Sequence, residues 1–218
     1  MRRKPSRERQ SPRAGRSRPG ANEQRPERLP APAPGELSAA QKEAAAELTA
    51  GPRGGVVGPF VAALRSPELM GRLQRLGEYL RYRNALGPRL TELAILLVAR
   101  EWTQQFEWAM HVDEARKRGV ARATISAIAR GTRPSRMRED EAIVHDFLRE
   151  LQERQDVGDP TYARALGAFG EQGVVDLTAL AGYYVTLAMI LNVARTALPP
   201  GKRPALRPLP ARRRRARV

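Results

Sequence analysis

Hydrophobic residues recur at helical spacing from residue 66 onward. After Ser66-Pro67, a pair typical of a helix start, the chain places leucines three or four residues apart. These leucines are Leu69, Leu73, Leu76 and Leu80, and their spacing predicts one buried face of an amphipathic helix. The run from Leu90 to Ala99 is almost wholly apolar, and the Gly87-Pro88 pair before it predicts where a second, buried helix begins.

The later part of the chain continues this pattern. Apolar positions at helical spacing predict further helices over residues 103–118, 123–130, 139–155, 160–169 and 174–198. No run of alternating apolar and polar residues is long enough to predict a strand. We therefore expect an all-α fold with a single compact multi-helix domain.

Charge is concentrated at the two ends of the chain. Residues 1–36 contain ten Lys or Arg residues and four acids, and residues 201–218 contain eight basic residues and no acid. Residues 37–200 are left with 21 basic and 19 acidic residues, although the whole chain carries a net charge of +16. We expect disordered basic tails at 1–36 and 201–218 around a nearly neutral domain. Such tails can contact nucleic acid through charge, without sequence selectivity.

Composition also limits the compartment and the class of chemistry. The chain has no cysteine, which excludes disulfides and thiolate zinc sites and is compatible with the cytoplasm. The longest apolar stretch, from Leu177 to Val193, is shorter than the roughly 20 residues of a membrane-spanning helix. We expect a cytoplasmic protein without a membrane partner, in which this stretch is a core or subunit-interface helix. Of the two histidines, His145 is expected at the surface, and nothing in the sequence requires a metal site.

Glu92 is the one ionisable residue inside the apolar run from Leu90 to Ala99. Burial disfavours the charged form of a carboxylate, so a glutamate at this position is a candidate acid or base. A second interpretation needs no chemistry, because an acidic residue near a helix N-terminus is stabilised by the helix dipole. The sequence leaves both interpretations open.

A second group of polar residues lies at helical spacing shortly after this run. His111 follows Glu107 by four residues and Gln104 by seven, so one helix over residues 103–118 would place all three on the same face. That face could also be a solvated polar stripe. Phe106 and Trp108 flank Glu107 in a chain with few aromatic residues, and they could line a pocket or belong to the core.

Glu92 and the segment that ends at His111 resemble a known family. The stretch from about residue 66 to residue 200 is similar to the carboxymuconolactone decarboxylase family, which shares the all-helical fold of the alkylhydroperoxidase D-like proteins. In the peroxidase branch a glutamate is followed by Cys-x-x-Cys-x-x-x-His, and the corresponding positions here are Glu92 and then Gln104, Glu107 and His111. The glutamate and the histidine match, but both cysteines are replaced. The resemblance therefore argues against a thiol peroxidase.

The resemblance implies a homo-oligomeric enzyme without a cofactor or metal. Its expected activity is that of a carboxy-lyase or related acid–base enzyme acting on a small carboxylated lactone or another intermediate of aromatic degradation. Such an enzyme holds the substrate carboxylates, stabilises an enolate and delivers a proton. We assign proton transfer to His111, an orienting or second-acid role to Glu92, and a pocket-acid role to Glu107. The candidates for substrate binding are Gln104, Phe106, Trp108, Arg89 and Arg100.

Residues 119–135 offer an alternative of a different class. Their sequence resembles the turn and recognition helix of a helix-turn-helix, with Thr124 and Ser126 facing outward and Arg130 and Arg133 near the phosphates. Together with the basic tails, this segment predicts a DNA- or RNA-binding protein. Its candidate recognition face carries few base-reading side chains, however. A catalytically silent member of the family is a third interpretation.

Overall fold

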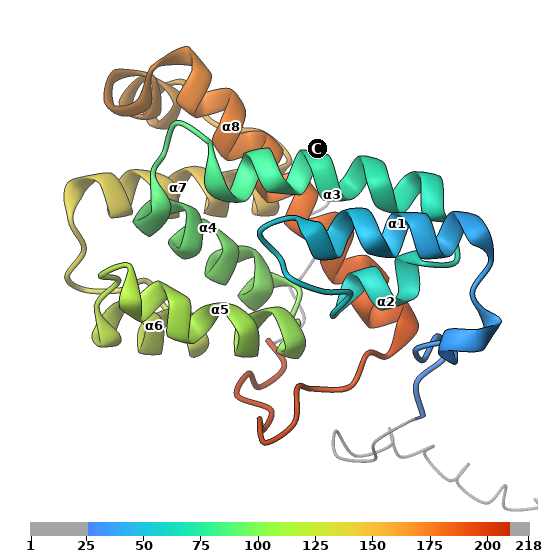
Figure 1. The fold of residues 1–218 in the computed structure, drawn as a ribbon. Coiled ribbons are helices and arrows are strands. Elements are labelled where there is room, and N and C mark those ends of the chain that lie inside the picture. The colour runs from blue at the N-terminus through green and yellow to red at the C-terminus, as the bar shows by residue number, and fades with distance from the viewer. Residues whose placement is uncertain (1–25, 210–218) are drawn as a thin grey trace, which may run out of the picture.

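The structure is a computed structural model that describes residues 26–209, and these residues form a single compact all-helical domain without a strand (Figure 1). The predicted fold class is therefore confirmed. The elements are η1 (Pro34–Glu36), α1 (Ala39–Ala50), α2 (Pro59–Ala63), α3 (Pro67–Tyr82), α4 (Pro88–Glu101), α5 (Gln105–Lys117), α6 (Arg122–Ala129), α7 (Glu139–Arg154) and α8 (Asp159–Ala194). The outer parts of the predicted tails, residues 1–25 and 210–218, lie outside the described residues.

Helix α4 forms the centre of the domain. It packs against α3, α5, α6, α7 and α8, and Figure 1 shows it with α5 and α6 below it and α3 and α7 above it. Gly87 precedes the helix in a left-handed conformation, with φ at 79°, and Pro88 supplies a preset φ for its first turn. The apolar run is buried on nearly every side, and each fully buried leucine contributes roughly 1.5–3 kcal/mol. Glu92, within this run, is therefore a buried carboxylate.

Helix α8 consists of two helical segments joined at Gly170. The backbone there has φ at 66° and ψ at 178°, which is accessible to glycine and interrupts the helix. The predicted helices over residues 160–169 and 174–198 correspond to these two segments. The second ends earlier than expected, because Arg195 adopts a left-handed conformation. By length and composition α8 could cross a membrane, but 56% of its most apolar window is buried inside the domain.

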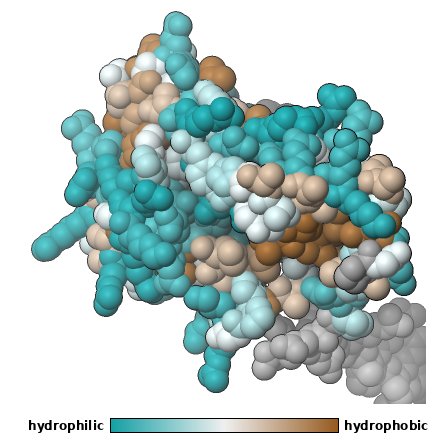
Figure 2. All heavy atoms as spheres, viewed as in Figure 1, coloured by the Kyte–Doolittle hydropathy of each residue, from teal (hydrophilic) through white to brown (hydrophobic). Residues whose placement is uncertain are grey.

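Helices α1 and α2 build a smaller apolar cluster that was not predicted. Ser38 caps α1 by accepting a hydrogen bond from the backbone N–H of Gln41, and α1 packs on α3. Leu48, Phe60 and Met70 are fully buried between these helices. On the face shown in Figure 2, hydrophobic residues gather around α2 within a mostly hydrophilic surface. The loop between α1 and α2 is thereby fixed next to α3.

The predicted leucine face of α3 is only partly buried. Leu80 is in the core, but Leu69 and Leu76 are 48% and 47% exposed. The buried line instead consists of Met70, Gln74, Gly77 and Leu80. The helix is rotated relative to our prediction because α1 packs on it, and α1 was absent from the sequence-based picture.

Residues 201–209, which we assigned to the C-terminal tail, lie against the domain. Leu206 is buried among core residues, and its backbone N–H donates to Gln105, whose amide nitrogen donates to the Leu206 carbonyl. Arg100 donates to the backbone carbonyl of Arg207 at 2.7 Å. Near the other end, the backbone N–H of Arg28 donates to the carbonyl of Ala194. The described parts of both predicted tails thus contact the helices.

Candidate active site

A buried histidine and a buried glutamate from adjacent helices form the centre of the site. His111 Nδ1 of α5 and Glu92 Oε2 of α4 are 2.7 Å apart, and the two residues are 6% and 4% exposed. The His111 ring also meets the edge of Tyr184 in α8, with ring centroids 5.4 Å apart. The sequence-based pairing of Glu92 with His111 therefore corresponds to a direct contact. A carboxylate at Nδ1 orients the ring and leaves Nε2 free to exchange a proton.

Gln104 fixes the start of α5. Its side-chain oxygen accepts hydrogen bonds from the backbone N–H groups of Phe106 and Glu107, and its amide nitrogen donates to Asn192 of α8. The helix therefore begins at Gln105, two residues later than the predicted start at residue 103. This cap places Glu107 and His111 one helical turn apart on the same face. Gln104 thus positions the site residues but does not line the cavity beside them.

Burial and nearby charges favour the neutral form of His111. Burial lowers its pKa below the ordinary value, and the hydrogen bond and charge of Glu92 oppose this effect. Arg81 and Arg53 lower the pKa of His111 further through their positive charges. Arg81 also lies close to the pair, with its Nε 3.7 Å from Glu92 Oε1. The imidazole is therefore available as a proton acceptor at neutral pH.

Glu107 is an acid held in its neutral form. It is 3% exposed, and neither of its carboxyl oxygens has a hydrogen-bond partner among residues 26–209. Burial raises its pKa well above the ordinary value for glutamate, because an unpaired charge is costly in this environment. A protonated carboxyl group can donate the proton that an anionic intermediate needs.

Glu107 and His111 line one cavity of about 280 Å³. Its walls come from the loop between α1 and α2 and from helices α2, α3, α5 and α8. The residues that line it are Pro52, Arg53, Val57, Pro59, Phe60, Arg81, Tyr82, Phe106, Glu107, Met110, His111, Tyr184 and Leu187. The cavity thus combines an acid, a neutral histidine, two arginines and a mostly apolar wall, an arrangement typical of a small-molecule site.

Other residues predicted for substrate binding lie elsewhere. Of the two aromatic neighbours of Glu107, Phe106 lines the cavity and Trp108 is buried in the core. Arg89 is paired with Glu141 at 2.6 Å and with Asp140. Because successive helical residues point about 100° apart, the residue that follows Glu107 faces a different neighbour. Glu107 and Trp108 are therefore neighbours in the sequence but do not lie on the same face of the helix.

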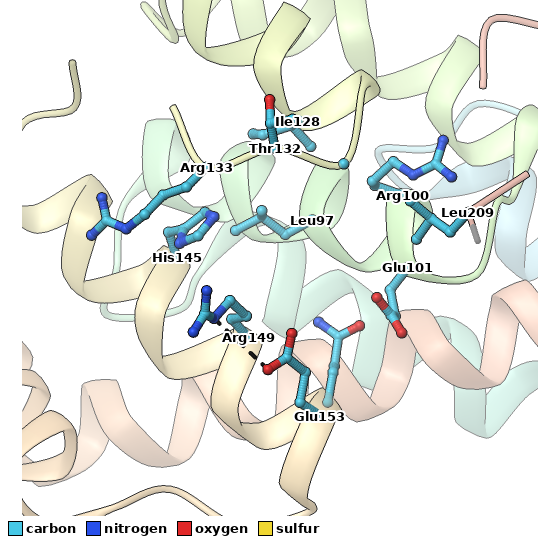
Figure 3. Close-up of a pocket in the computed structure, with 12 residues that line it drawn as sticks. Leu97, Arg100, Glu101, Ile128, Thr132, Arg133, His145, Arg149, Glu153 and Leu209 are labelled. Carbon is cyan, nitrogen blue, oxygen red and sulfur yellow. Dashed lines mark ion pairs between the residues drawn. The ribbon is translucent and has the colours of Figure 1, made fainter. Parts of the chain in front are cut away.

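Arg100 lines a second cavity of about 320 Å³, between α4, α6 and α7 (Figure 3). Figure 3 shows His145, Arg133 and Arg149 around it, with the Arg149–Glu153 ion pair drawn as a dashed line. Its charges are largely paired. His145 is buried, contrary to the prediction that it is a surface residue, because α7 turns it toward α4 and its Nδ1 contacts Asp146. This cavity is a weaker candidate, since its arginines already have acidic or backbone partners.

The predicted recognition face of residues 119–135 is only partly exposed. Thr124 was expected to face outward but is 1% exposed, and its hydroxyl group donates to the backbone carbonyl of Arg136. Ser126 is exposed as predicted and accepts a hydrogen bond from Arg130, and Arg133 donates to both carboxylate oxygens of Asp146. One of the two predicted outward side chains is thus unavailable for base reading.

Most of the cavity wall was not anticipated from the sequence, including Arg53, Arg81 and Tyr184. Arg81 and Tyr184 lie within helices that were predicted. To identify them as cavity residues, one would have to know which helices are adjacent. Arg53 lies in a loop that carries no motif. In the described range, no group of three or more His, Asp or Glu side chains is placed to hold a metal ion.

Comparison with known proteins matches one part of the chain to a family. Residues 67–136 match the sequence model of the carboxymuconolactone decarboxylase family, which confirms the predicted resemblance for this segment. The matched segment includes Arg81, Glu92, Glu107 and His111, but not Arg53 or α8. No curated protein matches the chain in sequence.

Proposed function

We propose that this protein is a carboxymuconolactone decarboxylase-like enzyme, a cofactor-independent carboxy-lyase that acts on a small carboxylated lactone or a related intermediate of aromatic degradation in the cytoplasm. The observation that carries the proposal is one cavity lined by the unpartnered acid Glu107 and by His111, whose ring is paired with the buried Glu92. The family match over residues 67–136 supports it, because these three residues lie within the matched segment. The lack of cysteine argues against thiol redox chemistry at this site.

The proposed reaction breaks the bond between a carboxylate and a carbon conjugated to a carbonyl. The electron pair of that bond moves into the conjugated system, so that carbon dioxide leaves and an enolate forms. Glu107, held protonated by burial, transfers its proton to the enolate carbon and becomes a carboxylate. His111, oriented by Glu92, then returns a proton from solvent to Glu107. The net reaction consumes one proton and releases one carbon dioxide.

The proposal is tested with 4-carboxymuconolactone generated in situ, by following loss of substrate and release of carbon dioxide. We expect turnover by the full-length protein and a loss of about 100-fold or more in His111→Gln and Glu107→Gln, as is common when acid–base groups are removed. Glu92→Gln should lower kcat because the imidazole loses its orienting carboxylate. Glu114→Gln is the matched control, since Glu114 lies on the same helix and pairs with Arg118 at the surface.

Absence of turnover by the folded wild-type protein would reject this substrate. Equal activity of wild type and His111→Gln would reject the assigned role of the histidine. Circular dichroism and thermal melting of each variant separate a loss of chemistry from a loss of fold.

The proposed enzyme is a homo-oligomer that uses the second segment of α8. Val175, Met189 and Val193 are 66%, 46% and 59% exposed on this helix, although their side chains are large and apolar. Burial of such residues between subunits would be favourable. Sedimentation equilibrium should give a mass above that of one chain, and Val193→Glu with Met189→Glu should lower it. A monomeric wild type would reject this part of the proposal.

A further inference from the structure

The loop between α1 and α2 forms one wall of the cavity. Arg53 and Val57 of this loop line it, and Gly54 and Gly58 turn the loop with φ at 72° and 58°. The loop precedes residue 67, so it lies outside the segment that matches the family. The family-matched segment supplies the acid–base residues, and a separate part of the chain supplies much of the wall that a substrate would contact.

Two glycines allow the loop to approach the helices this closely. A Cβ atom at Gly58 would lie 2.5 Å from Cε1 of Phe106. A Cβ atom at Gly77 in α3 would overlap the hydroxyl group of Tyr183 and lie 2.5 Å from Nη2 of Arg53. Both distances are below normal van der Waals contact, so a Cβ atom at either position would force neighbouring side chains to shift. Gly77 therefore leaves the space that the Arg53 guanidinium and the Tyr183 hydroxyl group occupy.

Arg53 has no acidic partner. Its Nη2 donates to the hydroxyl group of Tyr183 at 3.2 Å, and its guanidinium carbon lies 4.7 Å from the centre of the Phe60 ring. Its Nε is buried without a hydrogen-bond partner, and no carboxylate of residues 26–209 forms an ion pair with it. Glu92 is bonded to His111, and Glu107 is held neutral, so neither acid balances this charge. A half-buried guanidinium without an anion is a ready carboxylate-binding group.

The remaining wall near Arg53 is apolar. Val57, Tyr82 and Met110 are 51%, 44% and 45% exposed, and all three line the cavity. Phe106 of α5 lies against Gly58 and adds an aromatic surface. An apolar group that covers these side chains removes them from water, which favours binding by roughly 25 cal/mol per Å². A fully polar ligand would leave this surface unused.

We propose that Arg53 binds the carboxylate of the substrate, and that the substrate joins this carboxylate to an apolar ring or chain that contacts Val57, Tyr82, Phe106 and Met110. This inference rests on the proposed function for its reaction, and it adds the class of substrate and the residue that recognises it. The carboxylate completes the guanidinium hydrogen bonds, while the apolar body covers the exposed wall. The loop between α1 and α2 thus determines specificity, and α4 and α5 provide the acid–base groups.

Binding of three small probes to the full-length protein tests this inference, measured by saturation-transfer NMR titration. Benzoate has both the carboxylate and the apolar ring, acetate has only the carboxylate, and benzyl alcohol has only the ring. We expect benzoate to bind most tightly. Arg53→Gln should weaken benzoate binding about tenfold or more and leave benzyl alcohol binding unchanged, because a charged hydrogen bond is lost. Arg53→Lys should restore part of the affinity, since it retains the charge.

Arg75→Gln is the control, because Arg75 lies on α3 but pairs with Glu47 at the surface. The inference is overturned if wild type does not bind benzoate, or if Arg53→Gln binds it as wild type does. His111→Gln separates the two proposals. This variant should lose turnover but keep its affinity for benzoate. If the wild type shows Arg53-dependent binding of benzoate but no decarboxylation, the proposed reaction is rejected and the proposed anion site is retained.

Discussion

Replacement of Glu107 by glutamine should remove a loss of stability that the wild type undergoes as pH rises above 5. The folded state holds Glu107 protonated because burial raises its pKa, whereas the unfolded chain releases the proton near pH 4.5. The unfolded state therefore binds fewer protons than the folded state between these two pKa values. In that window the free energy of unfolding falls as pH rises. Glutamine has nearly the same shape and no proton to release, so the variant lacks this loss.

The size of the effect follows from proton linkage and has a ceiling. The contribution of Glu107 to the unfolding equilibrium changes at most about tenfold per pH unit above the unfolded pKa. Because pH 7 lies about 2.5 units above the unfolded pKa, the wild type can lose at most about 3 kcal/mol of this contribution at pH 7 relative to pH 4, and less if the folded pKa lies below 7. Glutamine also leaves a polar group without a partner, but that cost is the same at every pH. The slope with pH is thus the diagnostic quantity, rather than the absolute stability.

Urea unfolding of both proteins from pH 4 to pH 8, followed by circular dichroism, measures this slope. The wild type should lose stability relative to Glu107→Gln as pH rises from 4.5. Glu114→Gln is the matched control, because Glu114 is partly exposed and pairs with Arg118. Partial burial raises the pKa of Glu114, but the hydrogen bond and positive charge of Arg118 outweigh this effect and lower it. This variant should show a change of less than about 1 kcal/mol. Parallel stability curves for wild type and Glu107→Gln would refute the assignment of a buried neutral acid.

Three further predictions concern the histidine, the glycine in α3 and the C-terminal segment. Because burial lowers the pKa of His111, its contribution to stability is present above the unfolded pKa of about 6.5 and lost as pH falls. In urea titrations between pH 6.5 and pH 5, the wild type should therefore lose stability more steeply than His111→Gln. Gly77→Ala should lower stability by about 1–3 kcal/mol and weaken benzoate binding, because the added Cβ displaces Tyr183. Gly182→Ala has open space around its Cβ and should leave both unchanged or raise stability. A chain that ends at residue 201 should melt at a lower temperature than one that ends at residue 209, since it lacks buried Leu206, and equal melting temperatures would contradict the packing of this segment.

The parts of the structure that the sequence predicted are those with a strong local signal. The apolar run around Glu92 could only be a buried helix, and Gly87-Pro88 marked its start. The spacing of Glu107 and His111 placed both on one face once the helix was recognised. The pairing of His111 with Glu92 followed from the family resemblance, because spacing alone does not show which helices adjoin.

The parts that the sequence did not predict depend on contacts between distant segments. The buried face of α3 differs from its leucine pattern because α1, an alanine-rich helix, covers Met70 and Gln74. The role of Arg53 arises from two close approaches at glycines and from a tyrosine of α8. None of these features produces a periodic pattern or a motif. His145 was misplaced for the same reason, since its helix is covered on the side that its polar neighbours had indicated as exposed.

The replacement of both cysteine positions by Gln104 and Glu107 is consistent with a change in the kind of chemistry at the start of α5. Gln104 bonds the first backbone N–H groups of the helix and Asn192 of α8, so it has a structural role that a thiol could not fill. Glu107 faces the cavity as a carboxyl group without a partner, and a carboxyl group exchanges protons but not electrons. In the proposed reaction the retained Glu92–His111 pair exchanges protons as well. In the proposed enzyme, α4 and α5 therefore provide acid–base groups in place of the cysteines of the peroxidase pattern, and the loop that carries Arg53 provides the proposed site for the substrate carboxylate.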